Sequence, residues 1–328
     1  MKVQELRDLI KTADRTLLEK TFVESYKQFS KHQKEEVDLL IASILEGKEK
    51  QTDVKQKTVN FEELEKQITV FLKNAYAQNY FAPNRVIPKN QRPKWRFLVK
   101  GYIKQLEKVQ TESEFYPRMV KLFTDLYHLI CEACRYYYFS TDDAFRSIGW
   151  SQTELFHILV KKTFAAGYSR ENIAALVLAA STGGLSMDSL HIEQQMALLS
   201  ELNTADVKYM AIEEAKKLVS ENIKKQSALK KYDNRRYRLD EAVNNLCDMI
   251  LITYISLAEP EEGVSYYFEF CQEMDKEIVL YRALELADWM DEEDLWIDIY
   301  KYGIVKKIKP REKLVQQYGE RSKGKTST

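Results

Sequence analysis

Glycine and proline are scarce in this chain, which has 10 glycines and 6 prolines in 328 residues. Both residue types interrupt helices and supply the tight turns between strands. Over residues 60–303 no segment alternates apolar and polar residues in the manner of a half-buried strand. Apolar residues recur instead every three or four positions, in segments of about 15 to 28 residues. The sequence therefore predicts an all-α protein whose amphipathic helices bury their apolar stripes on one another.

Long hydrophobic runs are also missing. The longest, at 173–180, is much shorter than the roughly 20 residues that a membrane-spanning helix needs. The N-terminus, MKVQELRDLIKTADR, has neither the apolar core of a signal peptide nor the arginine and serine bias of a transit peptide. The chain has 4 cysteines, and their spacing is not that of a disulfide-rich protein. We therefore expect a soluble, cytoplasmic protein without a membrane partner.

Signatures of catalysis and of nucleotide binding are absent as well. The sequence contains no Gly-x-Ser-x-Gly, His-Glu-x-x-His or Gly-x-Gly-x-x-Gly motif. The glycine pair Gly183 and Gly184 follows the apolar helix predicted over 173–180, whereas a phosphate-binding loop precedes its helix. This pair is typical of a helix C-terminus and a turn. We expect a non-enzymatic protein that uses no cofactor.

Histidine and cysteine come close together once, in the string formed by His128, Cys131 and Cys134. Residues three apart drift around the axis of a helix, so at most two of these side chains can face one ion. A zinc site would need ligands from other helices, such as His157, Cys247 or Cys271. A buried enzyme site that combines His128, Cys131 and His157 is a third class of hypothesis. Because free cysteine is usually a small buried residue, we predict that none of these residues binds a metal.

Polar residues and prolines divide the predicted helices into groups. The predicted parts are an N-terminal three-helix unit (1–47), a polar linker (48–59), a helical bundle (60–139), a region of stacked helical hairpins (140–309) and a flexible tail (310–328). Helix pairs in the hairpin region recur about every 35 to 45 residues, which is compatible with a superhelical arrangement of the TPR or HEAT kind. Since no unit aligns with another by residue identity, we predict an irregular stack of helical hairpins.

The opening hairpin has a recognisable pattern. A short helix and a polar turn precede a leucine-rich helix that ends in an aromatic residue and lysine, and the next helix begins with lysine and glutamate. This pattern, over residues 6–45, resembles the start of an uncharacterised family of small bacterial helical proteins. The resemblance covers about an eighth of the chain. It implies a bacterial source, but no activity and no site.

Charge is balanced overall, with 50 basic and 50 acidic residues, but it is unevenly distributed. Residues 85–108 contain eight basic residues and one acidic residue, and residues 224–238 contain seven and one. The opposite holds for residues 259–298, with 14 acidic residues and 2 basic ones. Such blocks either select partners or neutralise one another in the fold. We expect neutralisation, with 259–298 as the internal complement of the arginines near 235.

The two basic segments combine cations with aromatic rings, which suits phosphate contacts and base stacking. Part of this composition has a simpler explanation, because Trp95 begins a predicted helix whose lysines lie on solvated faces. Its buried stripe would consist of Trp95, Leu98, Val99, Tyr102, Ile103 and Leu106. Nucleic-acid binding is therefore our alternative function. Its candidate residues are Arg85, Lys89, Arg92, Lys94, Arg96, Arg235, Arg236 and Arg238.

A dense group of carboxylates surrounds Trp289 and Trp296 in the acidic segment. No Asp-x-Asp-x-Asp-Gly loop of the calcium-binding kind occurs there. Carboxylates are favoured at a helix start, and their density also suits an acidic face that binds protein. Our main functional hypothesis is a scaffold or adaptor that binds another protein. The candidate residues are Asp288, Asp291, Glu292, Glu293, Asp294 and Trp296.

Overall fold

The computed structural model describes residues 9–29, 34, 38, 41 and 60–324. Regular structure in these residues is helical throughout, without a strand, so the all-α prediction is confirmed. The chain divides into two units, Met1–Asn60 and Phe61–Thr328. The predicted linker, 48–59, lies outside the described residues.

The first unit contributes one well-described helix, α2 (Arg15–Lys27). Asp14 caps it, because its carboxylate accepts a hydrogen bond from the backbone N–H of Thr16 at 3.1 Å. No residue of α2 is buried, and Leu17 and Phe22 are 60% and 54% exposed. The third helix predicted for this unit, at 32–46, lies almost wholly outside the described residues.

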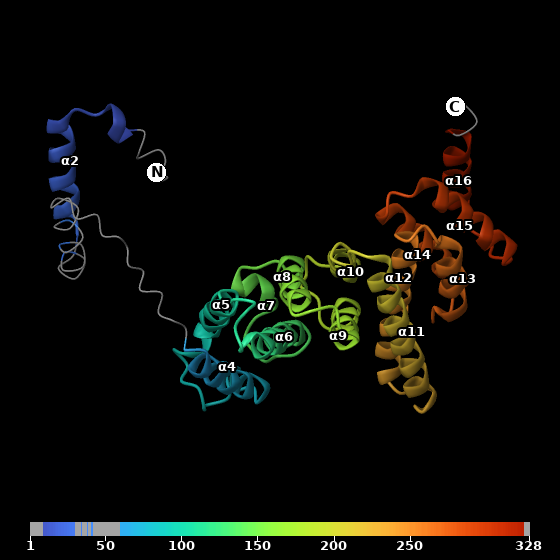
Figure 1. Ribbon diagram of the computed structural model, residues 1–328, viewed down its shortest axis with the longest axis horizontal. Coiled ribbons are helices and arrows are strands. Elements are labelled where there is room, and N and C mark those ends of the chain that lie inside the picture. Colours follow the sequence, from blue (N-terminus) through green and yellow to red (C-terminus); the bar gives the residue numbers. More distant parts are fainter. Residues whose placement is uncertain (1–8, 30–33, 35–37, 39–40, 42–59, 325–328) are drawn as a thin grey trace. The chain divides into compact units, whose positions relative to one another are not determined.

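The second unit begins with helices that pack around aromatic side chains (Figure 1). They are α4 (Phe61–Tyr76), the 3₁₀ turn η1 (Arg92–Lys94), α5 (Trp95–Leu106), α6 (Tyr116–Ala133) and α7 (Ala144–Ile148). The helix predicted over 111–139 is shorter than expected, since α6 ends at Ala133 and a loop follows. Phe139 anchors that loop, because its ring stacks on Trp95 with centroids 3.9 Å apart.

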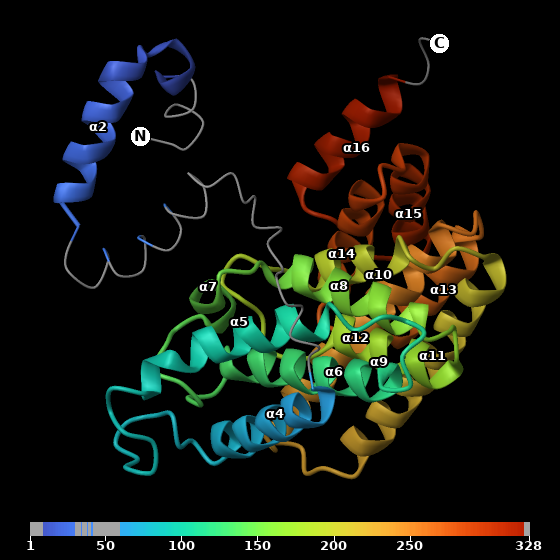
Figure 2. The ribbon, with the colours of Figure 1, turned by 60° about the vertical axis from the view of Figure 1, so that its left-hand side comes forward.

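The remaining helices follow one another with short connections, and neighbours in sequence pack together in space, as α9 on α10, α11 on α12 and α14 on α15 (Figures 1 and 2). They are α8 (Gln152–Ala165), α9 (Arg170–Ser181), α10 (His191–Leu199), α11 (Ala205–Ser227), α12 (Arg235–Ile255), α13 (Pro260–Phe270), α14 (Lys276–Trp289), α15 (Glu293–Val305) and α16 (Glu312–Gly324). Ser151 and Ser169 cap α8 and α9 through hydroxyl oxygens that accept backbone N–H groups at 3.1 Å. A superhelical course of this stack stays a prediction.

Helix α12 is the central element of the second half. Every residue from Val243 to Ile255 is buried. The helix contacts α9, α10 and α11, which precede it in the chain, and α13 and α14, which follow it. A helix that is buried all round must satisfy any polar side chain within the protein, because water does not reach it.

Two predicted features have different outcomes. The flexible tail predicted at 310–328 is wrong over most of its length, because α16 occupies 312–324 and buries Leu314 against the unit. The turn predicted at the glycine pair is present. Gly183 has a φ of 103°, and a Cβ at Gly184 would clash with the carbonyl oxygen of Cys131. Glycine is therefore required here by close approach of two backbones.

Candidate functional site

The cysteines and histidines lie in settings that do not favour catalysis. Burial raises the pKa of the Cys131 thiol to about 12, and burial also raises the pKa of the other three cysteines. A protonated thiol is a poor nucleophile and a poor metal ligand. On α8, the His157 Nε2 lies 2.7 Å from a carboxylate oxygen of Glu201. Over 60–324 and the short described stretches before it, no group of three or more His, Cys, Asp or Glu side chains could hold a metal ion.

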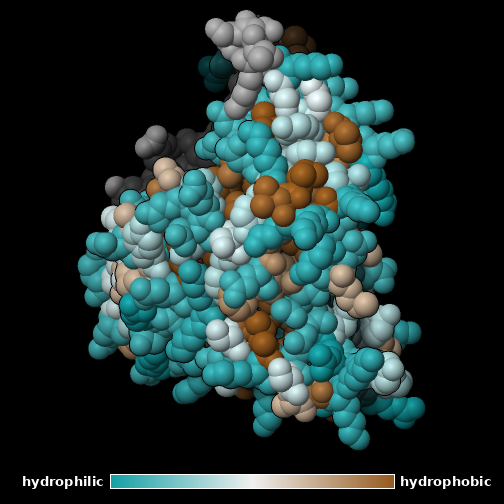
Figure 3. Space-filling model, turned by 90° about the vertical axis from the view of Figure 1, so that its right-hand side faces the viewer, coloured by the Kyte–Doolittle hydropathy of each residue, from teal (hydrophilic) through white to brown (hydrophobic). Residues whose placement is uncertain are grey.

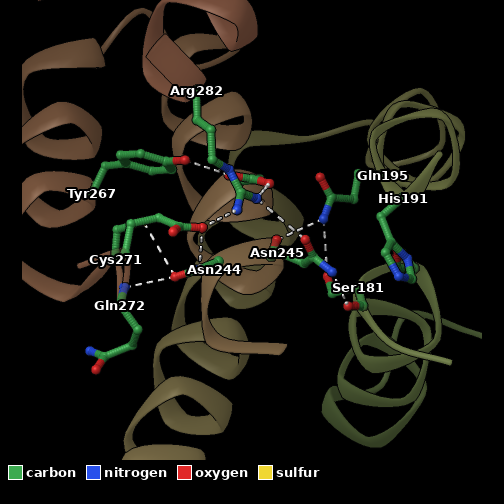
Figure 4. Close-up of polar contacts among 12 residues, drawn as sticks. Ser181, His191, Gln195, Asn244, Asn245, Tyr267, Cys271, Gln272 and Arg282 are labelled. Carbon is green, nitrogen blue, oxygen red and sulfur yellow. Dashed lines mark hydrogen bonds and ion pairs between the residues drawn. The ribbon is translucent and has the colours of Figure 1, made fainter. Parts of the chain in front are cut away.

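A buried polar network that the sequence analysis missed joins α9, α10, α12, α13 and α14 (Figure 4). Its centre is an ion pair between Arg282 and Asp248, whose Nη2 and Oδ2 atoms are 2.7 Å apart. The hydroxyl of Tyr267 donates to the other oxygen of Asp248, also at 2.7 Å. Arg282 reaches a second carboxylate, on Glu273, at 3.3 Å. Both carboxylates and the guanidinium are therefore held in one set of contacts.

The same network continues toward α9 and α10 through Asn245. The side-chain N–H of Asn245 donates to the backbone carbonyl of Ser181 at 3.1 Å. The backbone carbonyl of Asn245 accepts from the side-chain amide of Gln195 at 2.7 Å (Figure 4). These bonds link helices that are 50 to 64 residues apart in sequence. The network ties the stack together and presents no reactive group to solvent. Its signal in the sequence is a set of polar residues inside the otherwise apolar run 243–255, namely Asn244, Asn245 and Asp248.

The first basic segment begins in the irregular loop between α4 and α5 and continues through η1 and α5. Arg92 is not available to a ligand, because its Nε donates to the carbonyl of Ile87 at 2.8 Å and its Nη2 donates to the carbonyl of Asn84. It holds the loop, which corrects its assignment as a nucleic-acid contact. The other candidates of this segment are exposed and form no ion pair with a carboxylate in the described part of the chain. They are Arg85, Lys89, Lys94 and Arg96.

Most of the buried stripe predicted for α5 is confirmed. Trp95, Val99, Tyr102, Ile103 and Leu106 are buried. The predicted burial of Leu98 is wrong, since this side chain is 39% exposed. Its neighbour Phe97 is 63% exposed. The solvated face of α5 therefore carries apolar as well as basic side chains.

The second basic segment connects α11 to α12, and its three arginines have three different roles. Arg236 caps the end of α11 by donating to the carbonyls of Gln226 and Leu229 at 3.0 and 3.1 Å. Arg235 is exposed and pairs with Asp233 at 2.7 Å. Arg238 donates to the hydroxyl of Tyr136 at 2.6 Å. The expected pairing of these arginines with the acidic segment 259–298 is therefore wrong, because local groups and a distant tyrosine satisfy them first.

The loop after α6 contacts the second basic segment and the stretch of chain just before the first one. We call residues 136–138, three consecutive tyrosines, the tyrosine loop. Arg238 lies over the ring of Tyr136, with its Cζ 5.7 Å from the centroid. On the other side, the ring of Tyr137 lies 5.5 Å from that of Phe81, at the start of the first basic segment's loop, and its carbonyl accepts from Gln78 at 3.1 Å. One loop thus contacts two segments that are about 150 residues apart.

These parts contribute exposed cations and exposed rings. Tyr136 and Tyr137 are 41% and 65% exposed, and Tyr237, beside Arg238 in sequence, is 74% exposed. Figures 1 and 2 both show the loop after α4 and the turn between α11 and α12 on the lower edge of the second unit. We call this set the basic edge. It consists of Arg85, Lys89, Lys94, Arg96, Tyr136, Tyr137, Lys230, Lys231, Arg235, Tyr237 and Arg238.

The acidic candidates lie where α14 ends and α15 begins. Asp291 takes a φ of 57° at this turn, and it is exposed together with Glu292, Glu293 and Asp294. Trp296 is only 2% exposed, so it cannot offer its ring to a partner in this structure, and its assignment as a contact residue is corrected. Figure 3 shows that this side of the molecule is largely hydrophilic, with separate hydrophobic patches.

Helix α16 covers the ring of Trp296 and neutralises part of the acidic charge near it. Arg321 lies over the Trp296 ring, with its Cζ 4.4 Å from the centroid, and pairs with Asp288 at 2.7 Å. One turn earlier, Tyr318 stacks on Tyr300 with centroids 4.2 Å apart. The acidic segment therefore has an internal partner, but this partner is the C-terminal helix.

Comparisons of the chain with protein-family models, with curated proteins and with solved structures found no significant match. Among the described helices, none is both long and apolar enough to cross a membrane.

Proposed function

We propose that the protein binds single-stranded nucleic acid along the basic edge. The observation that supports this function is a pair of contacts made by the tyrosine loop, one with Arg238 of the second basic segment and one with Phe81, four residues before the first basic segment. The sequence alone left these segments as two separate stretches of charge. In the fold they flank exposed aromatic rings.

The chemistry of the edge suits an unpaired strand. Lysine and arginine side chains neutralise phosphates, and binding then depends on salt because counterions are released. Exposed rings stack on unpaired bases, and each such contact contributes about 1–3 kcal/mol. Tyr136 and Tyr137 are held by neighbours on one side, so less freedom is lost when a base stacks on them. A duplex, whose bases are already stacked, cannot use these rings.

The proposal is tested by fluorescence anisotropy with a labelled oligothymidylate strand of 20 nucleotides and with a duplex of the same length. We expect the single strand to bind more tightly, with log Kd rising linearly with log salt and a slope of several ions. Combined replacement of Arg85, Lys89 and Lys94 by alanine removes three cations that pair with no carboxylate of the described residues, and it is expected to lower both the affinity and the slope.

Matched controls replace Lys121 and Lys217 by alanine. These lysines are exposed and pair with Asp125 and Glu214 on their own helices. Their loss should leave the affinity and the slope unchanged. Absence of single-strand binding at 20 mM salt, or an equal loss in the control variant, contradicts the proposal.

A further inference from the structure

Helix α16 sits on α14 and α15 in the manner of a bound ligand helix. Its contacts come from Leu314, Tyr318 and Arg321, which are four and three residues apart. This spacing places the three side chains on one face of a helix, which is the arrangement by which amphipathic helices dock in grooves. The receiving surface consists of Glu277, Asp288, Trp296 and Tyr300, and we call it the α14–α15 surface.

The attachment of α16 is slight in comparison with other helices of the unit. Leu314 is buried, but the next residue, Val315, is 48% exposed. The other contacts are a ring stack, the Arg321 guanidinium over the Trp296 ring, and two ion pairs, Arg321–Asp288 and Arg311–Glu277, in which the side chains are partly solvated. One leucine and surface ion pairs hold a helix weakly, because water competes for the charges. A helix attached in this way can be displaced.

The surface has charge that α16 does not use. Asp291, Glu292 and Glu293 are exposed where α14 ends and α15 begins, three to five residues beyond the Asp288 that Arg321 contacts. Helix α16 itself carries Glu312 and Glu320, which oppose binding to a negative surface. A helix with the same apolar and aromatic face and more basic flanks would therefore gain favourable charge contacts.

We infer that the α14–α15 surface is a docking site for a basic amphipathic helix of a partner protein, and that α16 occupies this site within the same chain until the partner replaces it. The partner helix carries a leucine, an aromatic residue and an arginine at positions i, i+4 and i+7. This surface is separate from the basic edge, so the inference does not depend on nucleic-acid binding.

The experiment uses the full chain and a fluorescent peptide with the sequence of residues 309–323, in which Glu312 and Glu320 are replaced by lysine. Leu314→Asp in the full chain places a charge at the one buried position of α16 and releases the helix from the surface. We expect this variant to bind the peptide at least about tenfold more tightly than the wild type does, since removal of a resident competitor raises the fraction of competent sites.

Val315→Asp is the matched control, because the same charge is added one residue along at an exposed position. It should bind the peptide as the wild type does. Adding Asp288→Arg to Leu314→Asp should lower peptide affinity again by about fivefold or more, since the peptide arginine then meets a like charge. Circular dichroism of both variants checks that the rest of the helices remain folded.

Equal binding by the wild type and Leu314→Asp, or insensitivity to Asp288→Arg, overturns the inference. A wild-type dimer that becomes a monomer in Leu314→Asp also overturns it, because the surface would then serve exchange of α16 between two copies. Peptide binding that follows the expected order, with a monomeric wild type, supports a partner helix.

Discussion

An arginine meets a tyrosine in two places in this protein, and the two places differ in their access to water. Inside the stack, Arg282 and Tyr267 share the carboxylate of Asp248. At the basic edge, Arg238 contacts Tyr136 through its ring and hydroxyl. Tyr267 is buried, whereas Tyr136 is 41% exposed.

The difference separates structure from recognition. The inner ion pair, Arg282 with Asp248, is mostly buried, with side chains 28% and 12% exposed, so its charges have lost much of their water and depend on one another. The outer pair keeps its hydration and gains little from its contact, so it can exchange that contact for a phosphate or a base. The same residue types thus stabilise the fold in one region and are available to a ligand in the other.

The largest loss of stability is expected when the buried ion pair between Arg282 and Asp248 is broken. Arg282→Ala leaves the Asp248 carboxylate buried without its partner, and the free energy of unfolding should fall by about 3–5 kcal/mol. Urea unfolding followed by tryptophan fluorescence measures this change. Arg238→Ala, the surface counterpart, should cost less than about 0.5 kcal/mol.

A double variant sharpens this result. Arg282→Met with Asp248→Leu removes both charges, and it should be clearly more stable than Arg282→Ala alone. If the single and the double variants are equally unstable, the desolvated charge is not the cause of the loss.

A carboxylate held mainly by hydrogen bonds extends the comparison to Asp143, which is buried at the start of α7 and has one long ion pair, at 3.7 Å, with Arg146. Burial opposes its charge, but hydrogen bonds from Ser186, Arg146 and Met187 outweigh this and hold its pKa below the usual 3.8. Asp143→Ala should lower the free energy of unfolding by about 2 kcal/mol at pH 7.

The pH dependence of that loss follows from the sign of the shift. A pKa that is lower in the folded state means that the stabilisation is present above pH 3.8 and is lost as the pH falls through the folded value. The difference between wild type and Asp143→Ala should therefore shrink below about pH 4. A difference that is constant from pH 7 to pH 3 would contradict an ionised, hydrogen-bonded Asp143.

On the surface, the ring of Tyr137 is expected to matter for binding and not for stability. Tyr137→Ala should weaken single-strand binding by about 1–3 kcal/mol, because one stacking contact is lost. Tyr137→Phe keeps the ring and should bind within about twofold of the wild type. A loss of equal size in both variants would point to the hydroxyl and away from stacking.

The smallest effect distinguishes neighbouring arginines of the basic edge. Arg235→Ala should reduce the slope of log Kd against log salt by about 1, with little change in stability. Arg236→Ala should leave the slope unchanged and lower stability by about 1 kcal/mol, because the carbonyls that end α11 lose their donor. Salt titrations measure the slope and urea unfolding measures the stability of the two variants, so together they test this difference between Arg235 and Arg236.

Helices and their caps could be predicted from the sequence because they depend on residues close together in the chain. Asp14, Ser151 and Ser169, residue types that are favoured at helix starts, cap α2, α8 and α9. The end of α6 could not be predicted in this way, because Phe139 leaves the helix to stack on Trp95. The contact between Trp95 and Phe139, which are 44 residues apart, outweighs the local preference for helix.

The candidate site depends on still longer separations. The bond from Arg238 to Tyr136 spans 102 residues, and nothing in either segment indicates the other. Arg92 lies in the same basic segment as Arg85, and Arg236 in the same one as Arg235. Arg92 and Arg236 nevertheless donate to backbone carbonyls. Charge blocks were visible in the sequence, but which cations bind backbone and which face solvent follows only from the path of the chain.

The position of α16 after α14 and α15 in the chain has a consequence for synthesis. A ribosome makes about 5–20 residues each second and keeps the newest ones in its exit tunnel. The nascent chain therefore presents Trp296 and Tyr300 before Arg321 and Tyr318 have emerged to cover them. For that short interval, α16 does not cover the rings of Trp296 and Tyr300.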